Sequence, residues 1–358
     1  MKKHVYIIAE AGVNHNGSVS MAKRLIDAAA DAGADAVKFQ TFKAGKVMTE
    51  YAPKAEYQKT TTAAMESQLD MVRKLELDEA AHLALADHCR LRAIQFLSTP
   101  FDEDSLEMLT RVLRVPVLKI PSGEITNGPL LLKAAQSKKA VILSTGMSTL
   151  DEVRTALGIL AFGYGARGEK PSLSGFRESF RSAKGQQSLT SKVTLLHCTT
   201  EYPSAFADTN LRAMETMREA FGLRVGLSDH TPGIAASIAA AALGASVIEK
   251  HITLDRALPG PDHKASLLPD EFRQLVDSVR QVEAALGSGK KRPAKGELKN
   301  LRIARKSLVA LRDIERGEIF TGDNLGCKRP GGGILPIHYW QILGGRARKH
   351  FAKDEVIK

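Results

Sequence analysis

The sequence predicts a (β/α)8 barrel followed by a small β-rich domain. Two observations in residues 1–255 support the barrel: eight short apolar runs, and the helix-length stretches that separate them. A third observation, a change of pattern after residue 286, supports the second domain. The eight runs, which we predict to be strands, are residues 5–10, 36–40, 93–99, 117–122, 141–145, 193–199, 224–230 and 247–253.

The stretches between the runs have the period of amphipathic helices. In residues 18–33 one face is apolar, and Gly33 ends the pattern. We expect the last barrel helix over residues 268–286, because Pro269 and two acidic residues open it, as suits the first turn of a helix. The apolar face of residues 18–33 consists of Ala22, Leu25, Ile26, Ala29 and Ala30.

The chain divides at a segment rich in glycine, proline and charge. Residues 287–297 read GSGKKRPAKGE, which breaks the helical period. We therefore predict a barrel domain over residues 1–286, a linker over 287–304 and a second domain over 305–358. The second domain shows short apolar runs and glycine-rich turns without a long helix. A domain of this size is marginal alone, so we expect it to dock on another surface.

Composition indicates a cytoplasmic globular protein without a membrane segment. The chain has 358 residues, of which 43% are hydrophobic and 25% charged, as suits one barrel and a small additional unit. The first residues have too short an apolar core for a signal peptide, and no apolar run approaches the roughly 18 residues of a membrane helix. Cys89, Cys198 and Cys327 are widely spaced, as for reduced thiols.

The net charge of +11 is concentrated near the C-terminus. Residues 286–358 hold 17 lysines and arginines against 7 acidic residues, so the rest of the chain is nearly neutral. A basic tail can bind nucleic acid, but no recognition motif or interleaved aromatic residues accompany this one. We expect no nucleic-acid partner, and interpret the charge as a solvated face or as a surface that meets an acidic substrate or another chain.

Residues 163–192 interrupt the strand–helix pattern between the fifth and sixth strands. Gly163, Gly165 and Gly168 match the spacing G-x-G-x-x-G. A dinucleotide site requires a strand before this motif and a helix after it, whereas here a helical stretch precedes it and polar, loop-like sequence follows. We predict no dinucleotide site, and expect an elaboration on the N-terminal face of the barrel, away from the active site.

Chemically capable side chains cluster at the predicted strand ends, where barrel enzymes carry their active sites. Lys38 and Lys119 end the second and fourth strands. Each fits a Schiff-base nucleophile, an anion clamp or a salt bridge. Their convergence with several hydroxyl groups favours a clamp for phosphate and carboxylate oxygens. The hydroxyl groups belong to Thr99, Ser122, Ser144 and Ser228.

His230 and His251 end the seventh and eighth strands, which are neighbours in a closed barrel. The two imidazoles are within reach of one divalent ion, with water and substrate oxygens completing its coordination. The pattern fits an exchangeable Mn²⁺, Mg²⁺ or Zn²⁺, and equally a general acid–base or structural role. Asp229 is a candidate partner for the His230 ring, although adjacent strand residues point to opposite faces.

Four further polar residues lie near the expected active site. Glu10, Glu124 and Asp262 suit the orientation of hydroxyl groups or proton transfer. Asp262 lies in PGPDHKAS after the eighth strand, where a surface turn fits equally well. Tyr202, in CTTEYP after the sixth strand, suits a hydrogen bond to a polyol or a contact within the loop.

Ten segments in order resemble the sialic acid synthase family, almost from end to end. They are IAEAGVNHNGS, AVKFQTFKA, STPFDEDS, KIPSGEITN, ILSTGM, LLHCTTEYP, VGLSDHT, IEKHITLD, GPDHKAS and KRPGGGI. The resemblance implies condensation of phosphoenolpyruvate with an N-acylated mannosamine-type sugar to give a nine-carbon α-keto acid and phosphate. It also implies that residues 305–358 are an antifreeze-like (SAF) domain. Only residues 163–192 have no counterpart in the pattern.

The resemblance implies roles for individual residues. Glu10 would lie near the reacting centre. His230 and His251 would ligate a catalytic divalent metal, for which Mn²⁺ is the favoured ion and Mg²⁺, Co²⁺ or Zn²⁺ are the alternatives. Phosphoenolpyruvate would be held by Lys38, Thr99, Lys119, Ser122, Ser144, Thr200 and Ser228. The sugar would be contacted by Gln40, Glu124, Tyr202, Asp262 and Arg329.

The same resemblance implies a homodimer in which the SAF domain of one chain covers the barrel of the other. Arg329 would then reach the N-acetyl group of the sugar in the partner chain. In the implied reaction the metal acts as a Lewis acid on the open-chain aldehyde, which C3 of phosphoenolpyruvate attacks. Water then adds to the enol carbon and phosphate leaves with C–O cleavage.

Two acceptors and two rival functions stay open. Thr200 stands where N-acetylneuraminate synthases carry asparagine. This resembles the legionaminic acid synthases and favours 2,4-diacetamido-2,4,6-trideoxy-mannose over N-acetylmannosamine. A class I aldolase would use Lys38 or Lys119 as its Schiff-base amine. A carbohydrate-binding protein would leave the polar strand ends unexplained.

Overall fold

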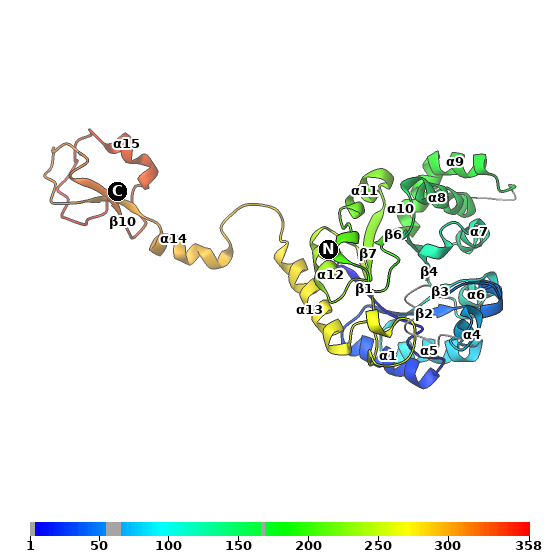
Figure 1. Ribbon diagram of the computed structural model, residues 1–358. Coiled ribbons are helices and arrows are strands. Elements are labelled where there is room, and N and C mark those ends of the chain that lie inside the picture. Colours follow the sequence, from blue (N-terminus) through cyan, green and yellow to red (C-terminus); the bar gives the residue numbers. More distant parts are fainter. Residues whose placement is uncertain (1–3, 55–65, 166–168) are drawn as a thin grey trace. The chain divides into compact units, whose positions relative to one another are not determined.

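The protein folds into two compact units, Met1–Gly287 and Ser288–Lys358, and its computed structural model describes residues 4–54, 66–165 and 169–358. Figure 1 labels most of the elements of each unit. The first unit contains parallel strands that begin within two residues of the predicted runs. They are β1 (Tyr6–Gly12), β2 (Ala36–Thr41), β3 (Gln95–Pro100), β4 (Val117–Ile120), β5 (Ala140–Ser144), β6 (Val193–Cys198), β7 (Arg224–Asp229) and β8 (Val247–His251).

These strands curve into the predicted barrel. Their hydrogen-bonded order is β3-β2-β1-β8-β7-β6-β5-β4, so the first and last strands of the barrel are neighbours. β3 and β4 approach each other at the remaining seam, where the described residues form no ladder. The parallel order brings the carboxyl ends of all the strands to one face, which confirms the predicted architecture.

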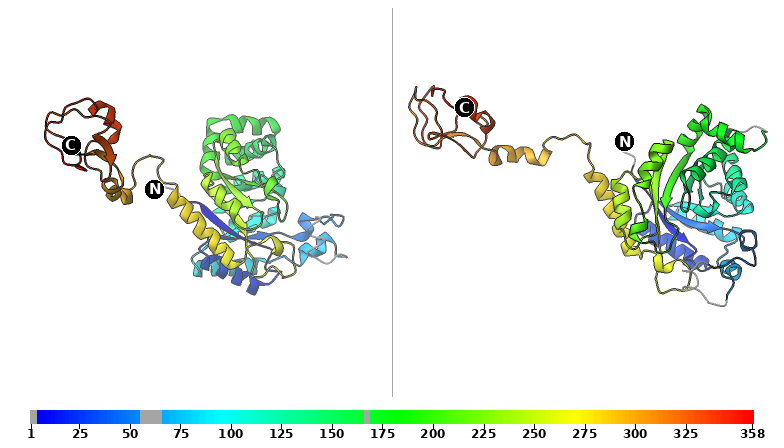
Figure 2. Two further views of the ribbon diagram at one scale, coloured as in Figure 1. Left: turned by 60° about the vertical axis from the view of Figure 1, so that its left-hand side comes forward. Right: turned by 45° about the horizontal axis from the view of Figure 1, so that its top comes forward.

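Helical segments connect successive strands, and two further views show them around the sheet (Figure 2). The helices of the first unit are α1 (Val19–Asp31), α2 (Ala44–Val47), α4 (Gln68–Arg73), α5 (Glu79–Leu91), α6 (Glu103–Glu107), α7 (Gly128–Gln136), α8 (Leu150–Gly165), α9 (Leu173–Arg181), α10 (Ala183–Lys192), α11 (Ala213–Phe221), α12 (Ala235–Ala242) and α13 (Pro269–Ala285). None of the helices in the described ranges is both long and apolar enough to cross a membrane.

The first helix illustrates how local sequence sets these elements. Ser18 Oγ accepts a hydrogen bond from the Met21 amide at 3.2 Å, which satisfies one of the unpaired donors at the helix start. Gly33, just after the helix, has a φ of 82°, a left-handed conformation that glycine adopts without strain. Ala30 is only half-buried, because it lies at the edge of the apolar stripe. The buried residues of the helix are Ala22, Leu25, Ile26 and Ala29.

Residues 163–192 are largely helical, which corrects the expectation of a loop-like segment. α8 continues to Gly165, and α9 and α10 follow it. Phe176 and Phe180 of α9 pack against the barrel core, so an apolar face stabilises a segment of polar composition. Gly163 lies inside α8, where a Cβ atom would come within 2.6 Å of the Ala135 side chain. Gly168 of the glycine motif lies outside the described residues.

The second unit is small and β-rich, as predicted. β9 (Ser307–Ala310) and β10 (Leu325–Lys328) pair antiparallel. α14 (Leu298–Ala304) lies within the segment predicted as a linker, and α15 (Tyr339–Ile342) is a single turn. The unit has an apolar core of its own, made by Leu308, Ala310, Ile314, Phe320, Leu325, Ala347, Phe351 and Ile357.

Candidate active site

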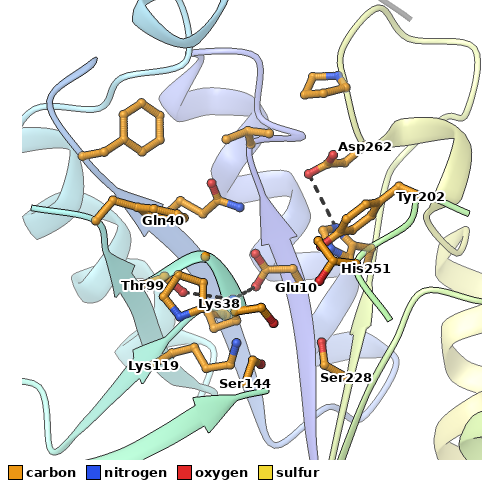
Figure 3. Close-up of a pocket in the computed structure, with 18 of the residues that line it drawn as sticks. Glu10, Lys38, Gln40, Thr99, Lys119, Ser144, Tyr202, Ser228, His251 and Asp262 are labelled. Carbon is orange, nitrogen blue, oxygen red and sulfur yellow. Dashed lines mark hydrogen bonds and ion pairs between the residues drawn. The ribbon is translucent and has the colours of Figure 1, made fainter. Parts of the chain in front are cut away.

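A cavity of about 270 Å³ lies at the carboxyl ends of the barrel strands. In Figure 3, Lys119 and Ser144 lie across the cavity from Asp262. The structure therefore brings together side chains from strands and loops that are far apart in the sequence. The predicted site residues that line the cavity are Glu10, Lys38, Gln40, Thr99, Lys119, Ser122, Ser144, Thr200, Tyr202, Ser228, His230, His251 and Asp262.

Strand register places the charged members of the cavity side by side. Glu10 in β1 is the Cα partner of both Lys38 in β2 and His251 in β8. Ser228 in β7 is the partner of Glu249 in β8. Side chains alternate along a strand, so Glu249 and His251 share the face that lines the cavity.

Two lysines and two carboxylates form one buried ion-pair cluster. Lys38 Nζ lies 2.5 Å from Glu10 Oε2 and 3.7 Å from Glu249 Oε2, and Lys119 Nζ lies 3.3 Å from Glu249 Oε1. All four side chains are at most 5% exposed. Lys38 also donates to Thr99 Oγ1 at 3.1 Å. Such pairing is what allows charged groups to remain buried.

The two carboxylates of this cluster have opposite pKa shifts. Burial raises the pKa of Glu10 to about 7, although Lys38 opposes the shift. Burial also acts on Glu249, but Lys119 and Lys38 outweigh it and lower its pKa to about 2. Glu249 is therefore ionised at neutral pH, whereas Glu10 exchanges its proton near pH 7.

The two lysines also differ. Burial lowers the pKa of each ammonium group, but for Lys38 the attraction of Glu10 and Glu249 prevails and the pKa is raised. For Lys119 burial prevails and the pKa is lowered. Lys38 is therefore held in its charged form, which suits an anion clamp and not the neutral amine of a Schiff-base nucleophile.

The hydroxyl groups around the lysines differ in their bonding. Ser228 Oγ donates a hydrogen bond to Glu249 Oε1 at 2.9 Å, and Ser122 Oγ accepts a hydrogen bond from the backbone amide of Gly146, also at 2.9 Å. Ser144 Oγ and Thr200 Oγ1 are buried and have no hydrogen-bond partner among the described residues. Buried polar atoms are normally paired. These two hydroxyl groups are therefore available to oxygen atoms of a ligand.

His230 and His251 are neighbours, as barrel closure predicts. Their ring centroids are 5.5 Å apart, and the Tyr202 ring lies 4.1 Å from the first and 5.7 Å from the second. Burial lowers the pKa of His230 to about 4 and that of His251 well below its ordinary value. Both imidazoles are therefore neutral at neutral pH, the form that binds metal ions.

The two rings fit the requirements of a divalent cation. His230 Nδ1 lies 2.6 Å from the Thr199 carbonyl, which places the ring proton on Nδ1 and leaves Nε2 as a lone-pair donor. His251 Nδ1 is buried without a hydrogen-bond partner in the described part of the chain, and Asp262 Oδ2 lies 3.9 Å from it. No cluster of three or more metal-binding side chains occurs within residues 4–54, 66–165 and 169–358, so other oxygen atoms would complete the coordination.

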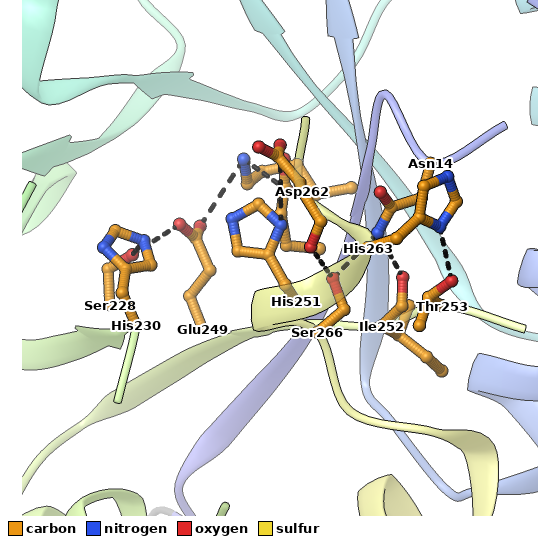
Figure 4. Close-up of polar contacts among 12 residues, drawn as sticks. Asn14, Ser228, His230, Glu249, His251, Ile252, Thr253, Asp262, His263 and Ser266 are labelled. Atoms are coloured by element: carbon orange, nitrogen blue, oxygen red, sulfur yellow. Dashed lines mark hydrogen bonds and ion pairs between the residues drawn. The ribbon is translucent and has the colours of Figure 1, made fainter. Parts of the chain in front are cut away.

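The loop that carries Asp262 is fixed by a network behind it (Figure 4). Asn14 Nδ2 donates to the Ile252 carbonyl and to Ser266 Oγ, both at 2.9 Å, and Ser266 Oγ donates to the Asp262 carbonyl at 2.7 Å. Burial raises the pKa of Asp262 to about 6. The network holds this carboxyl group beside the His251 ring.

One wall of the cavity is apolar. Residues after β1, β2 and β3 contribute to it together with α2 and α4, and the Phe42 and Phe101 rings meet edge to face at 6.1 Å. The cavity thus combines a charged side with an apolar side. We use the name apolar wall for Val13, Phe42, Val47, Met48, Met71, Val72, Leu75 and Phe101.

Two predicted site residues do not line this cavity. Glu124 lies in the turn Ser122–Glu124 and accepts a hydrogen bond from Asn127 Nδ2 at 2.6 Å. Arg329 belongs to the second unit, where its Nε donates to the Ala304 carbonyl at 2.9 Å. The structure therefore does not link Glu124 to the charged cluster, and Arg329 belongs to a different unit from that cluster.

Glu249 and Asp229 show how the alternation of side chains along a strand decides which residues face the cavity. Sequence reasoning missed Glu249, although its spacing of two from His251 in IEKHI places both on one face of a strand. Asp229, considered as a partner of the His230 ring, instead points to the opposite face. There it forms an ion pair with Lys250 at 3.0 Å.

Known proteins resemble the chain over nearly its whole length. Residues 25–291 match the NeuB family and residues 305–358 match the SAF domain. The N,N'-diacetyllegionaminic acid synthase of Campylobacter jejuni is 51% identical over 99% of each chain. The synthase of the same name from Legionella pneumophila is 45% identical over 95% of this chain and 90% of its own. The structure of the N-acetylneuraminic acid synthetase of Leptospira borgpetersenii, in complex with citrate, is 34% identical with a TM-score of 0.68, over 83% of this chain and 90% of that one.

Proposed function

The chain belongs to the NeuB family, and we propose that it condenses phosphoenolpyruvate with an N-acylated amino sugar to give a nonulosonic acid and phosphate. The observation that carries this proposal is the buried pair of lysines, with unpartnered hydroxyl groups beside them and two neutral histidines facing the same cavity. Its relatives named above are synthases of such acids.

Phosphoenolpyruvate fits the charged side of the cavity. Its carboxylate and phosphate need several cationic and neutral donors, which Lys38, Lys119, Ser144 and Thr200 supply. Glu249 contacts both ammonium groups. This arrangement organises the donors before the substrate binds, which lowers the free energy needed to order them.

The apolar wall favours 2,4-diacetamido-2,4,6-trideoxy-mannose as the acceptor. This sugar has methyl groups at C6 and on both acetamido substituents, whereas N-acetylmannosamine would turn extra hydroxyl groups toward side chains that cannot pair with them. Gln68 of α4 also lines the cavity, and its buried Oε1, which has no hydrogen-bond partner among the described residues, can accept a hydrogen bond from an acetamido N–H group. N-acetylmannosamine remains the second acceptor to be tested.

His230 and His251 would hold a divalent cation, for which we propose Mn²⁺. Such a cation would act as a Lewis acid toward the acceptor aldehyde. In the reaction, C3 of phosphoenolpyruvate bonds to the aldehyde carbon, and the aldehyde oxygen takes a proton from solvent water. A second water molecule then adds to C2. The bond from C2 to the bridging oxygen breaks, phosphate leaves with that oxygen, and the C2 hydroxyl group loses its proton to become the keto group. Glu10, with its pKa of about 7, accepts the proton that the water loses.

The proposal also covers the role of the second unit and the cellular location of the enzyme. We propose that the SAF domain of one chain covers the barrel of a second chain in a homodimer, so that Arg329 contacts the acceptor there. We expect a cytoplasmic enzyme, in keeping with three cysteines that form no disulfide bond.

A phosphate-release assay tests the proposal. Phosphoenolpyruvate is supplied with each of the two sugars in parallel, before and after chelation and after readdition of Mn²⁺. We expect stoichiometric phosphate and nonulosonic acid, faster turnover with the diacetamido sugar, and loss of turnover on chelation. Borohydride trapping of a substrate adduct without phosphate release would instead support the aldolase, with Lys119 as the amine. Sugar binding without turnover would support a carbohydrate-binding protein.

A further inference from the structure

A second buried ion pair lies directly behind the histidine pair. Asp229 Oδ2 is 3.0 Å from Lys250 Nζ, and both side chains are 0% exposed. The two residues are Cα partners in the β7–β8 ladder. Each precedes one of the histidines in the sequence, so strand alternation turns the ion pair outward and the imidazoles toward the cavity.

The ion pair connects β7, the turn after it, β8 and α12. Asp229 Oδ1 accepts from the Thr231 amide at 2.8 Å and from Thr231 Oγ1 at 2.7 Å, and Asp229 Oδ2 accepts from Ser237 Oγ of α12 at 2.6 Å. Lys250 also donates to the Thr231 carbonyl. β7, the turn after it, β8 and α12 are therefore fixed relative to one another around one carboxylate and one ammonium group.

Stability alone does not explain this arrangement. Burying two charges is unfavourable, and well-packed apolar residues of similar volume often serve a core equally well or better. The surrounding residues of the same outward face are apolar, as Leu227 in β7 illustrates with 1% exposure. The Asp229–Lys250 ion pair makes hydrogen bonds with preferred directions, whereas apolar side chains at the same positions would make contacts without preferred directions. Directional bonds fix the register and rotation of the two strand ends.

We infer that Asp229 and Lys250 are positioning residues that set the distance and angle between the His230 and His251 rings. The inference rests on the proposed function, in which these rings hold a divalent cation. The 5.5 Å separation of their centroids depends on the rotation of β7 and β8, which the ion pair behind them constrains. Groups that hydrogen-bond directly to metal ligands typically change metal affinity about 10- to 100-fold when they are removed. This ion pair would act on the two rings through the backbone of the strands that carry them.

Four variants of the full-length protein test the inference. Asp229→Asn and Lys250→Met each leave one charge buried without its partner, and the double variant removes both charges. Leu227→Ala is the matched control, because it creates a cavity on the same face of β7 without touching the ion pair. Mn²⁺ affinity is measured by titration calorimetry, together with the melting temperature and phosphoenolpyruvate affinity.

We expect at least tenfold weaker Mn²⁺ binding in both single variants and in the double variant. The melting temperature should fall in the single variants and recover toward that of the wild type in the double variant. Leu227→Ala should lower the melting temperature and leave Mn²⁺ affinity unchanged. If a single variant does not fold, the double variant decides the question.

Wild-type Mn²⁺ affinity in the double variant would overturn the inference while leaving the proposed function intact. An equal loss of affinity in Leu227→Ala would also overturn it, because the loss would then follow general destabilisation. A wild-type protein that binds phosphoenolpyruvate and no divalent cation would instead contradict the metal site itself, and the positioning role with it.

Discussion

Glu10 and Glu249 show how position changes the chemistry of one residue type. Both are buried, and both contact Lys38. Glu249 also contacts Lys119, and this second cation keeps it ionised. Among the described residues Glu10 forms an ion pair with Lys38 alone, and Lys119 acts on it only weakly, so burial prevails. One carboxylate therefore organises the lysines, while the other is suited to proton transfer near neutral pH.

The raised pKa of Glu10 predicts the pH dependence of turnover. As the proposed base, Glu10 must be ionised, so kcat should rise as pH increases through about 7. Glu10→Gln should lower kcat by about 100-fold or more and abolish this rise. The measurement is a pH–rate profile at saturating substrates, with Mn²⁺ affinity as a control for an intact site. An unchanged profile in the variant would assign the ionisation to another group.

The elements divide into those that build the site and those that support the barrel from outside. α2 and α4 contribute to the apolar wall, whereas α9 and α10 pack on α8 and line no part of the cavity. Substitutions in the two groups should therefore have different consequences. Substitutions in α2 and α4 should change acceptor selectivity, and substitutions in α9 and α10 should change stability alone.

A substitution in α4 should alter acceptor selectivity. Val72→Thr keeps the shape of the side chain and adds a hydroxyl group to the apolar wall. We expect KM for the diacetamido sugar to rise about 3- to 10-fold, with little change in KM for phosphoenolpyruvate. Val19→Thr, at the half-buried start of α1, is the matched control. Equal effects on both substrates, or an equal effect of the control, would contradict the assignment.

A substitution in α10 should lower stability without affecting catalysis. A Cβ atom at Gly185 would lie 1.9 Å from the Ser179 carbonyl oxygen, so Gly185→Ala forces α9 and α10 apart. We expect a lower melting temperature with kcat and both KM values within about twofold of the wild type at 25 °C. Gly165→Ala is the control, since a Cβ atom there meets no atom of the described residues within 4 Å. A large change in KM would mean that this segment communicates with the site.

At the level of the whole molecule, the two units can be tested by subunit complementation. His251→Ala disables the barrel, and Arg329→Ala disables the second unit. In the proposed dimer, co-expression of the two inactive chains produces one complete site per mixed dimer, because each barrel receives the second unit of the other chain. We expect activity to return to about a quarter of the wild-type level for random pairing. No recovery in isolated mixed dimers would mean that each chain covers its own barrel.

Local pattern was sufficient for the architecture, because strand and helix periods are properties of neighbouring residues. The eight runs, the stop of α1 at Gly33 and the polar strand ends all followed from it, and the strand-end rule identified most of the polar side chains that line the cavity. The helices in residues 163–192 did not, because Phe176 and Phe180 stabilise them only through contact with a distant core.

The sequence by itself determined which side chains could meet at the carboxyl ends of the strands. Only the tertiary structure decided which of them do meet, and in what state. Glu249 entered the lysine cluster, Asp229 turned away from His230 to pair with Lys250, and Glu10 acquired a pKa of about 7. These outcomes depend on burial and on distances across the barrel, which arise when residues remote in sequence exclude water together.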